Sequence, residues 1–435
     1  GAYAVAEPEP VPGGTLRIGL EAEADGLNPT INRFAIGAHV MAAAVYEPLV
    51  YITDDPCGCI HSPGLAESWE PSDDYMTWDF KMREGVEFHD GSMLDAETVL
   101  YALQMQLKDP LIGLAIKGLF VDDNPDTDAF EPAELVDDMT IRYHLKRTHV
   151  DFPGYLSAQL GYIPSLPYMK AAQEDGALNQ QPVGSGPFMF DSREQDLMTR
   201  FVKNPNWWRE ASPNLDALEF YIYTDTELAA GAFEAGDLDA MHTSNIDATL
   251  ALRSLGDDVQ LWEVIQGEAT DGMVNTAKAP FDDIRARKAL TYATARDNYL
   301  EFIGQGELIP AEGPFGPETI YYNSDVVQEH DMPEKAGPLV EEYCSDVPDS
   351  CTDGKINMEF QYSGPSVLQE RIYDVLADGW NPYFNITKQM IPQDDHITQV
   401  VIGQYDFVTW RQWGERNPDQ FVVWTNCESV GFLAL

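Results

Sequence analysis

A His-Asp-Gly triplet at residues 89–91 is the first segment whose side chains could carry out chemistry. A histidine beside a carboxylate can act as a general base or bind a metal, and Glu97 supplies a further acid nearby. The same triplet is also typical of a tight turn, because Asp accepts bonds from nearby backbone amides and Gly adopts positive φ. The flanking elements decide between the two interpretations.

Alternating patterns surround the triplet. Residues 78–82 and 86–90 alternate apolar and polar side chains around an Arg-Glu-Gly turn, which predicts a β-hairpin. We expect Ser92 to cap the helix that follows, since apolar residues recur at helical spacing over 94–107. The triplet therefore ends a strand and faces a turn, which favours a structural role over a catalytic one.

Signatures of known catalytic and cofactor sites are missing from the sequence. It contains no HExxH, no Walker A loop, no GxGxxG after a strand and no GxSxG. The eight histidines form no pair at helical spacing, so we expect neither a metal nor another cofactor. Paired carboxylates carry little information among 73 acidic residues. The residues by themselves indicate no visible enzymatic chemistry.

Composition and charge narrow the class of protein. A chain of 435 residues, 44% of them hydrophobic, is long enough for at least two lobes with separate cores. Its 26 basic and 73 acidic residues give a net charge of −47. Such a surface repels phosphate backbones, so no nucleic acid partner is expected. The charge is most simply explained by solubility, including in a salty habitat; attraction of cationic ligands is the alternative.

Cysteine usage indicates an oxidising compartment. Cys344 and Cys351 enclose a short acidic loop, and we expect them to form a disulfide. Cys57, Cys59 and Cys427 have neither CxxC nor zinc-ligand spacing. The first 14 residues are interpreted as a Pro-rich tether left after removal of a leader. The sequence contains no run of about 18 uncharged apolar residues, which is the length needed to span a bilayer.

The remaining elements are mixed. Alternation predicts strands over 13–20, 137–147, 215–225 and 405–410. Helical periodicity predicts helices over 226–241, 282–302 and 368–380. Because strands and helices alternate in the last third, the fold class is α/β.

Five long segments resemble blocks of one protein family. LAESWEPSDDYMTWDFKMREGVEFHDGSMLDAETVLYAL (65–103) resembles the signature of the family 5 bacterial extracellular solute-binding proteins, the dipeptide, oligopeptide and nickel receptors of ABC importers. Residues 13–20, 182–190, 204–241 and 279–301 resemble further family blocks, in the same order. The resemblance covers nearly the whole chain. It implies that the His-Asp-Gly segment is scaffold of an extra domain.

The resemblance implies a two-lobed periplasmic-binding-protein (Venus-flytrap) fold, whose lobes close over a solute by hinge motion. Lobe I is expected over 1–45 and 182–268, with an extra third domain inserted at 46–181. Lobe II is expected over 269–435, with the hinge near 268–276. Lobe II ends early relative to similar proteins, and we expect the partner of Cys427 to lie in the missing tail.

Cleft residues can be carried over from the family to matching positions. The loop after the first strand implies Asn32, Arg33 and Phe34 at the rim of lobe I. The hinge strand offers Met273 and Asn275. Aromatic walls with a few fixed polar groups are typical of such clefts.

The segment 405–421 is the richest in candidates. Similar peptide receptors hold the peptide's amino terminus with an acid after Gly-Trp, and Glu415 follows Trp413 at that point. Arg416 could instead bind a carboxylate, or pair with surface acids. Further ligand-binding candidates are Trp410, which could equally belong to the core, together with Arg411 and His396.

The function implied by the resemblance is that of the substrate-binding protein of an ABC importer. We expect a monomer that captures a di- or oligopeptide and delivers it to membrane permease subunits, without a cofactor. It would work in the periplasm or on the outer face of the cytoplasmic membrane, and a lipid anchor before processing is left open. Alternative solutes are a sugar, an opine-like amino-acid derivative or a chelated metal. A secreted hydrolase and a periplasmic adaptor or signalling receptor with the same fold are the competing classes.

Overall fold

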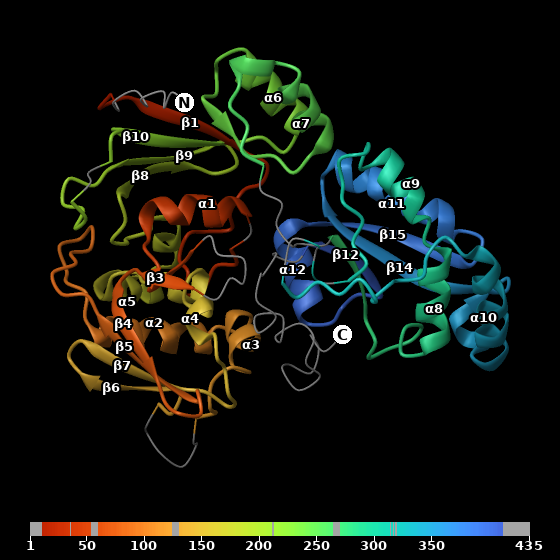
Figure 1. The fold of residues 1–435 in the computed structure, drawn as a ribbon, viewed down its shortest axis with the longest axis horizontal. Helices are drawn as coiled ribbons and strands as arrows, with labels where there is room; N and C mark the ends of the chain where they lie inside the picture. Colours follow the sequence, from red (N-terminus) through yellow and green to blue (C-terminus); the bar gives the residue numbers. More distant parts are fainter. Residues whose placement is uncertain are drawn as a thin grey trace, which may run out of the picture.

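The structure is a computed structural model of the chain. It describes residues 11–34, 36–53, 60–123, 130–210, 213–263, 270–313, 315, 317 and 320–411. Two α/β lobes lie side by side, and a further domain lies against the first of them (Figure 1). Among the described residues, no helix combines the length and the apolar character needed to cross a membrane.

Lobe I is built on one mixed five-stranded sheet in the order β11-β1-β10-β9-β8. Its strands are β1 (Thr15–Leu20), β8 (Phe188–Glu194), β9 (Met198–Lys203), β10 (Ala217–Ile222) and β11 (Ala240–Met241). Strand β1 lies between β11 and β10 and pairs in parallel with both. The lobe also contains α1 (Ile36–Val45), α6 (Thr226–Glu234) and α7 (Ile246–Arg253). Apolar side chains of β1, β9, β10 and α1 form its core.

The inserted domain lies between β1 and β8 in the sequence and has a core of its own. Its main sheet is antiparallel, in the order β4-β5-β7-β6, with a separate β2–β3 pair. These strands are β2 (Val50–Ile52), β3 (His61–Pro63), β4 (Ala66–Pro71), β5 (Thr77–Met82), β6 (Ala133–Asp137) and β7 (Thr140–His144). The helices are α2 (Ala96–Lys108), α3 (Ile112–Ile116), α4 (Phe152–Tyr155) and α5 (Leu166–Glu174), with 3-10 turns η1 (Gln159–Gly161) and η2 (Gly176–Gln180).

Lobe II has a second mixed sheet centred on β14, which pairs in parallel with β15 and β16. Its strands are β12 (Thr270–Val274), β13 (Cys351–Thr352), β14 (Lys355–Gly364), β15 (Phe384–Pro392) and β16 (Phe407–Arg411). Its helices are α8 (Ile284–Ala293), α9 (Arg296–Phe302), α10 (Pro333–Asp346), α11 (Val367–Trp380) and α12 (Gln393–Val401). The buried rings of Phe360, Trp380 and Phe407 pack edge to face or tilted at its centre.

The expected disulfide is confirmed. Cys344 of α10 and Cys351 of β13 are bonded, with their Cα atoms 5.7 Å apart. The bond ties the end of a helix to an edge strand across the short 3-10 turn η4 (Pro348–Ser350). Cys57, Cys59 and Cys427 lie outside the described residues.

Four local predictions are wrong. The helix expected over 226–241 ends at Glu234, and residues 240–241 form strand β11. The strand over 78–82 does not form a hairpin with 86–90, because β5 pairs with β4 on one side and β7 on the other. Ser92 does not cap the following helix, since the cap is Asp95, whose carboxylate accepts from the backbone N–H of Thr98. The single helix expected over 282–302 is divided into α8 and α9, because the backbone turns extended at Thr294.

Candidate functional site

His89 connects the inserted domain to the polypeptide that re-enters lobe I. Its Nε2 donates to the carbonyl of Gly186 at 3.0 Å, and its Nδ1 accepts from the amide of Gly184 at 3.3 Å. The two glycines lie directly against Val45, where a Cβ at Gly184 would come within 2.2 Å of the Val45 carbonyl oxygen. Burial lowers the pKa of His89, so the ring is neutral and both nitrogens are engaged in backbone contacts.

Asp90 stabilises the turn itself. One carboxylate oxygen accepts from the backbone amide and hydroxyl of Ser92, at 3.0 and 2.6 Å, and the other accepts from the Ser165 hydroxyl at 2.5 Å. Burial raises the pKa of Asp90, but these hydrogen bonds outweigh it and hold the pKa below its usual value. Gly91 follows with φ of +85°. The turn interpretation of the His-Asp-Gly triplet is confirmed.

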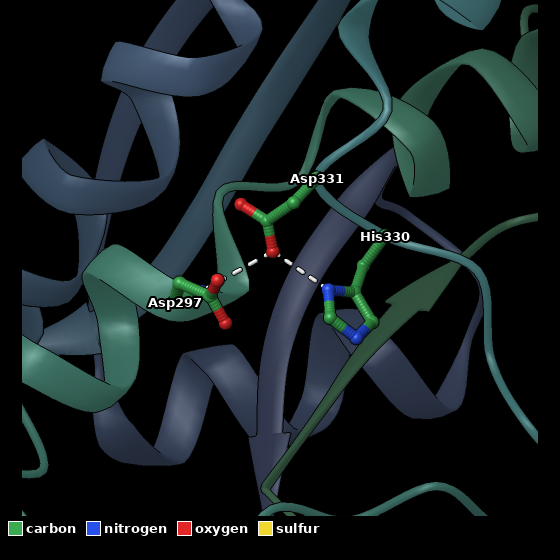
Figure 2. Close-up of side chains that lie close together, drawn as sticks. All are labelled: Asp297, His330 and Asp331. Atoms are coloured by element: carbon green, nitrogen blue, oxygen red, sulfur yellow. Dashed lines mark hydrogen bonds and ion pairs between the residues drawn. The ribbon is translucent and has the colours of Figure 1, made fainter.

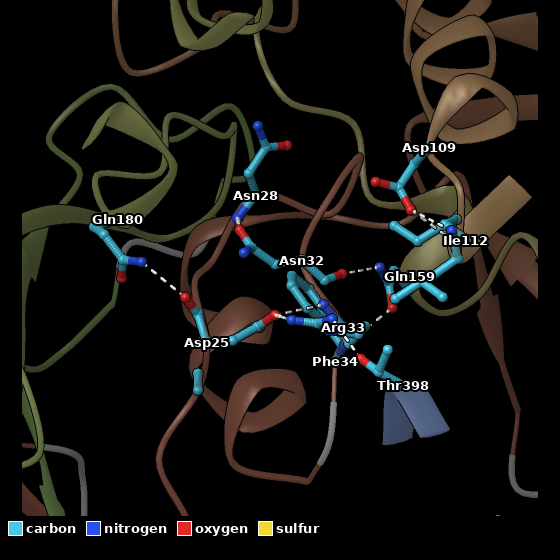
Figure 3. A network of polar contacts seen from close by, with 12 residues as sticks. Asp25, Asn28, Asn32, Arg33, Phe34, Asp109, Ile112, Gln159, Gln180 and Thr398 are labelled. Carbon is cyan, nitrogen blue, oxygen red and sulfur yellow. Dashed lines mark hydrogen bonds and ion pairs between the residues drawn. The ribbon is translucent and has the colours of Figure 1, made fainter. Parts of the chain in front are cut away.

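The loop between β1 and α1 carries the first polar group that reaches lobe II. Arg33 donates from Nε and Nη2 to Oδ2 of Asp25, at 3.1 and 2.8 Å, and from Nη1 to the hydroxyl of Thr398 on α12, at 3.0 Å (Figure 3). Asp25 is largely buried, whereas 29% of the Arg33 side chain is exposed. The carboxylate therefore anchors a guanidinium whose remaining face is directed toward the opposite lobe.

Residues of the inserted domain hold this loop in place. Gln159 donates from Nε2 to the carbonyls of Pro29 and Asn32, at 3.0 and 2.7 Å, and accepts from the Phe34 amide at 3.3 Å (Figure 3). Gln180 donates to the carbonyl of Asp25 at 2.8 Å. The loop that carries Arg33 is thus positioned from both sides by one domain.

The side chains of two rim candidates make contacts within lobe I and with the inserted domain. The Asn32 side-chain oxygen accepts from the backbone amide of Asn28 at 3.0 Å, closing the loop on itself. The Phe34 ring is buried and contacts the rings of His39 and Tyr162. Ligand contacts from Asn32 and Phe34 stay predictions, and the structure assigns both side chains to holding the loop.

On lobe II, α12 and β16 bring two further candidates together. His396 is buried, with its Nδ1 3.3 Å from Nε2 of Gln361 and its ring 5.9 Å from that of Trp410. Burial lowers the pKa of His396 to about 4, an effect that a hydrogen bond to the Thr409 backbone only partly offsets. Trp410 is partly buried against a small apolar cluster. Thr398, two residues beyond His396, is the group that meets Arg33.

The two hinge-strand candidates are internal to lobe II. Met273 is buried in the cluster that also contains Val400 and Val408. Asn275 donates from its amide to the carbonyl of Gly403 at 2.8 Å and accepts from the amide of Ala277 at 3.0 Å. Their positions are structural, and their contact with a ligand stays a prediction.

The last group of candidates falls outside the description of the structure. Arg411 ends β16, where its backbone pairs with Thr270, but its side chain is outside the described residues. Trp413, Glu415 and Arg416 lie outside them as well. Among the binding candidates that the structure describes, Arg33, Met273, His396 and Trp410 lie on α12 or contact it.

Asp25, Gln159 and Thr398 form the surroundings of Arg33 and were not foreseen. Asp25 is one of 73 acidic residues, and Gln159 and Thr398 are separated from Arg33 by 126 and 365 positions, respectively (159 − 33 and 398 − 33). No periodic pattern singles out any of these three side chains. Only the folded arrangement shows that they position a cation at the boundary between the lobes.

A group of possible metal ligands lies elsewhere in lobe II. Within the described residues, Asp297, His330 and Asp331 form a set of three whose ligand atoms are within 4.8 Å of one another (Figure 2). Asp331 accepts from His330 Nδ1 at 2.6 Å and from the Asp297 backbone amide at 3.3 Å. Both contacts are ordinary hydrogen bonds, and Asp297 and Asp331 are exposed. The set therefore needs no ion to explain it.

Known proteins resemble this chain over most of its length. A di/tripeptide-binding protein of Pseudomonas aeruginosa is 26% identical over 96% of this chain and 80% of its own. The heme-binding protein A of Haemophilus influenzae is 34% identical over 64% of this chain, but the match spans only 53% of that relative. A periplasmic binding protein associated with an ABC transporter of Helicobacter pylori, solved with the peptide STSA, superposes with a TM-score of 0.78 at 19% identity. That match covers 95% of this chain and 81% of the other.

The family assignment rests on the match to a family model. The model of the bacterial extracellular solute-binding proteins, family 5, matches residues 61–432. This range includes most of the inserted domain, the second part of lobe I and lobe II, and the structural superposition confirms the two-lobed fold. The chain therefore belongs to the family 5 bacterial extracellular solute-binding proteins.

Proposed function

We propose that this protein is the substrate-binding component of an ABC importer. It captures a small organic solute, most favourably a di- or oligopeptide, between lobes I and II and presents it to membrane permease subunits. The family match, with a di/tripeptide-binding protein of Pseudomonas aeruginosa among the relatives, supports this proposal. The corresponding domain limits are 1–45 and 182–268 for lobe I, 46–181 for the inserted domain and 269–435 for lobe II.

The observation that carries the proposal is the contact between Arg33 and Thr398. This contact links a loop of lobe I to a helix of lobe II. The Arg33 guanidinium is held by the largely buried carboxylate of Asp25. An arginine fixed in this way can turn from a hydroxyl partner to a ligand carboxylate, with which it forms a stronger, charge-assisted bond. Arg33 is thus suited to receive the acid end of a zwitterionic solute.

The other end of the solute has a proposed partner as well. We assign the ammonium group of a peptide to Glu415, with Trp413 lining the pocket beside it. Two opposite charges at opposite ends of one cleft would select zwitterions and set the direction in which they bind. If Arg416 faces the cleft instead, the acid end is held on that side.

In this proposal the protein binds its solute and releases it chemically unchanged. Membership in a family of solute-binding proteins supports this conclusion. Its proposed place of action is the periplasm, as a monomer. Steady release of product from a peptide or glycoside library by the purified protein would contradict the proposal that the solute is released unchanged.

Calorimetry and thermal unfolding test the proposed ligand class. The protein is unfolded and refolded to remove any co-purified solute, then titrated with dipeptides, tripeptides, heme and nickel ions. A ligand at a hundredfold excess over its Kd should raise the free energy of unfolding by about 2.7 kcal/mol. Binding of heme alone, with no response to any peptide, would overturn the peptide assignment while retaining the solute-binding one.

Two matched variants test the role of Arg33. Arg33→Ala should weaken peptide binding about tenfold or more, because it removes a charged partner from a partly enclosed site. Arg142→Ala is the control, since Arg142 forms an equally well-defined pair with Asp79 in the outer sheet of the inserted domain, at 2.6 and 2.7 Å. Equal effects of the two variants on affinity would show that Arg33 acts only through stability.

A further inference from the structure

A second set of contacts joins the lobes away from Arg33. Helix α7 of lobe I lies beside α9 and α11 of lobe II (Figure 1). It carries Asp247 in its first turn and Arg253 in its last. Both side chains point across the boundary, so one short helix contributes an anion and a cation to the opposite lobe.

Asp247 is held by two donors from lobe II. One of its carboxylate oxygens accepts from Arg371 on α11, and the other accepts from the side-chain amide of Gln305, beyond the end of α9. The second terminal nitrogen of Arg371 donates to the carbonyl of Phe302 at 3.0 Å. Arg371 is therefore oriented from within its own lobe before it meets Asp247. The hydrogen bonds from Gln305 and Arg371 lower the pKa of Asp247, which keeps it ionised.

Arg253 forms the corresponding contact at the other end of α7. Its Nη1 lies 2.5 Å from Oε2 of Glu307 in lobe II, and its Nη2 pairs with Glu263 of its own lobe. The arrangement is like that of Arg371, because one guanidinium nitrogen binds a group of its own lobe and the other binds an acid of the opposite lobe. We call Asp247, Arg253, Gln305, Glu307 and Arg371 the interlobe seam.

The high negative charge of the molecule makes ion pairs between the lobes important for closing. At a net charge of −47, acidic surfaces that approach one another repel. The seam contributes two of the 26 basic residues to the boundary, each paired with an acid of the opposite lobe. Its four charged side chains are 31–41% exposed, so each pair changes a closing equilibrium by about fivefold at most. Two pairs and one amide contact together give roughly five- to thirtyfold.

We propose that the interlobe seam is a closing latch that sets how long a solute stays bound. The inference rests on the proposed function, since it concerns the closed state in which a solute would be held. The seam residues are positioning residues. They hold the two lobes together, whereas the proposed ligand site lies on the α12 side of the boundary. A latch formed on closing slows dissociation and leaves association almost unchanged.

Charge reversal tests the seam in the complete protein. Asp247→Arg and Arg371→Asp are made singly and together, and Arg142→Asp serves as the control for reversing an ion pair elsewhere. Small-angle X-ray scattering without ligand measures the radius of gyration. Stopped-flow mixing with dialanine measures association and dissociation rates. The ligand-free measurement tests the latch even if dialanine does not bind.

Each single reversal breaks one of the two pairs, so it should increase the radius of gyration and speed dialanine release about fivefold, and the double reversal should restore both. The control should change neither. Single variants that match the parent in scattering, or a double variant that restores nothing, would overturn the latch. If dialanine binds no variant, including the parent, while scattering responds as expected, the latch stands and the peptide assignment fails. Folding of each variant is checked by its thermal unfolding.

Discussion

Protonation of His396 should destabilise lobe II in a narrow pH range. The ring is buried between Gln361 and Trp410, and its Nδ1 faces the amide N–H of Gln361, so its surroundings accept the neutral form. Burial lowers its pKa to about 4, against about 6.5 in an unfolded chain. Between these two values the unfolded state binds a proton that the folded state does not. Stability is therefore complete above pH 6.5 and decreases as the pH falls toward 4.

The size of the effect follows from the shift. A difference of about 2.5 pKa units corresponds to about 3.4 kcal/mol, most of which is already lost when the pH has fallen to 4. At pH 4.5 the expected loss is roughly 2.5 kcal/mol, and at pH 7.5 it is close to zero. The 73 acidic residues also titrate at low pH, so the absolute profile is not informative. The difference between two variants isolates the histidine.

The variant is His396→Gln, which keeps a polar side chain and removes the titration. Urea unfolding is measured at pH 7.5 and 4.5 for the parent and the variant, and lobe II is followed by hydrogen exchange of β14. The parent should lose roughly 2.5 kcal/mol more than the variant between the two pH values. His39→Gln is the matched control, because burial lowers the pKa of His39 to about 4 as well, but in lobe I. Parallel losses in lobe II for the parent and His396→Gln would refute the reasoning.

Other features of the chain can be tested as directly. Asp95→Ala should lower the free energy of unfolding by about 1 kcal/mol and Ser92→Ala by less, since only Asp95 caps α2; equal losses in thermal unfolding would contradict this assignment. Reduction of the Cys344–Cys351 bond, which closes a loop with a sequence separation of 7, should reduce the stability of lobe II by about 2.4 kcal/mol on a loop-entropy estimate. A variant with serine at both positions should then be insensitive to the reductant. Free Ni²⁺ should show no micromolar binding in calorimetry, because the ligand set around His330 offers one imidazole; micromolar binding lost in His330→Ala would prove otherwise.

Local periodicity in the sequence predicted elements well and their partners poorly. The strands around 215–225 and 405–410 and the helix at 368–380 appear as β10, β16 and α11. The hairpin after residue 78 failed because alternation reports which face of a strand is buried and says nothing about which strand lies beside it. Here β7, about 60 residues further along the chain (140 − 82 = 58), takes the place that the near neighbour was expected to fill.

The predictions for the candidate site also differ in how well they agree with the structure. A resemblance to family blocks predicted Arg33 at the rim of lobe I, and the structure places its guanidinium against α12 of lobe II. The same inference placed Phe34 beside it, where the ring instead packs into the core of lobe I. Family position indicates that a loop faces the cleft, but neighbouring side chains on a loop point in different directions. Burial decides between them, and burial depends on contacts distant in sequence.

The inserted domain connects these observations. Gln159 and Gln180 hold the loop on which Arg33 lies, and His89 fastens the same domain to the chain that returns to lobe I. A loop has few internal contacts, so a cation at its end keeps its position only if other elements supply hydrogen bonds to its backbone. The inserted domain supplies them from residues more than 120 positions away in the sequence (159 − 33 = 126). In the proposed function, the inserted domain therefore contributes to ligand binding by orienting Arg33.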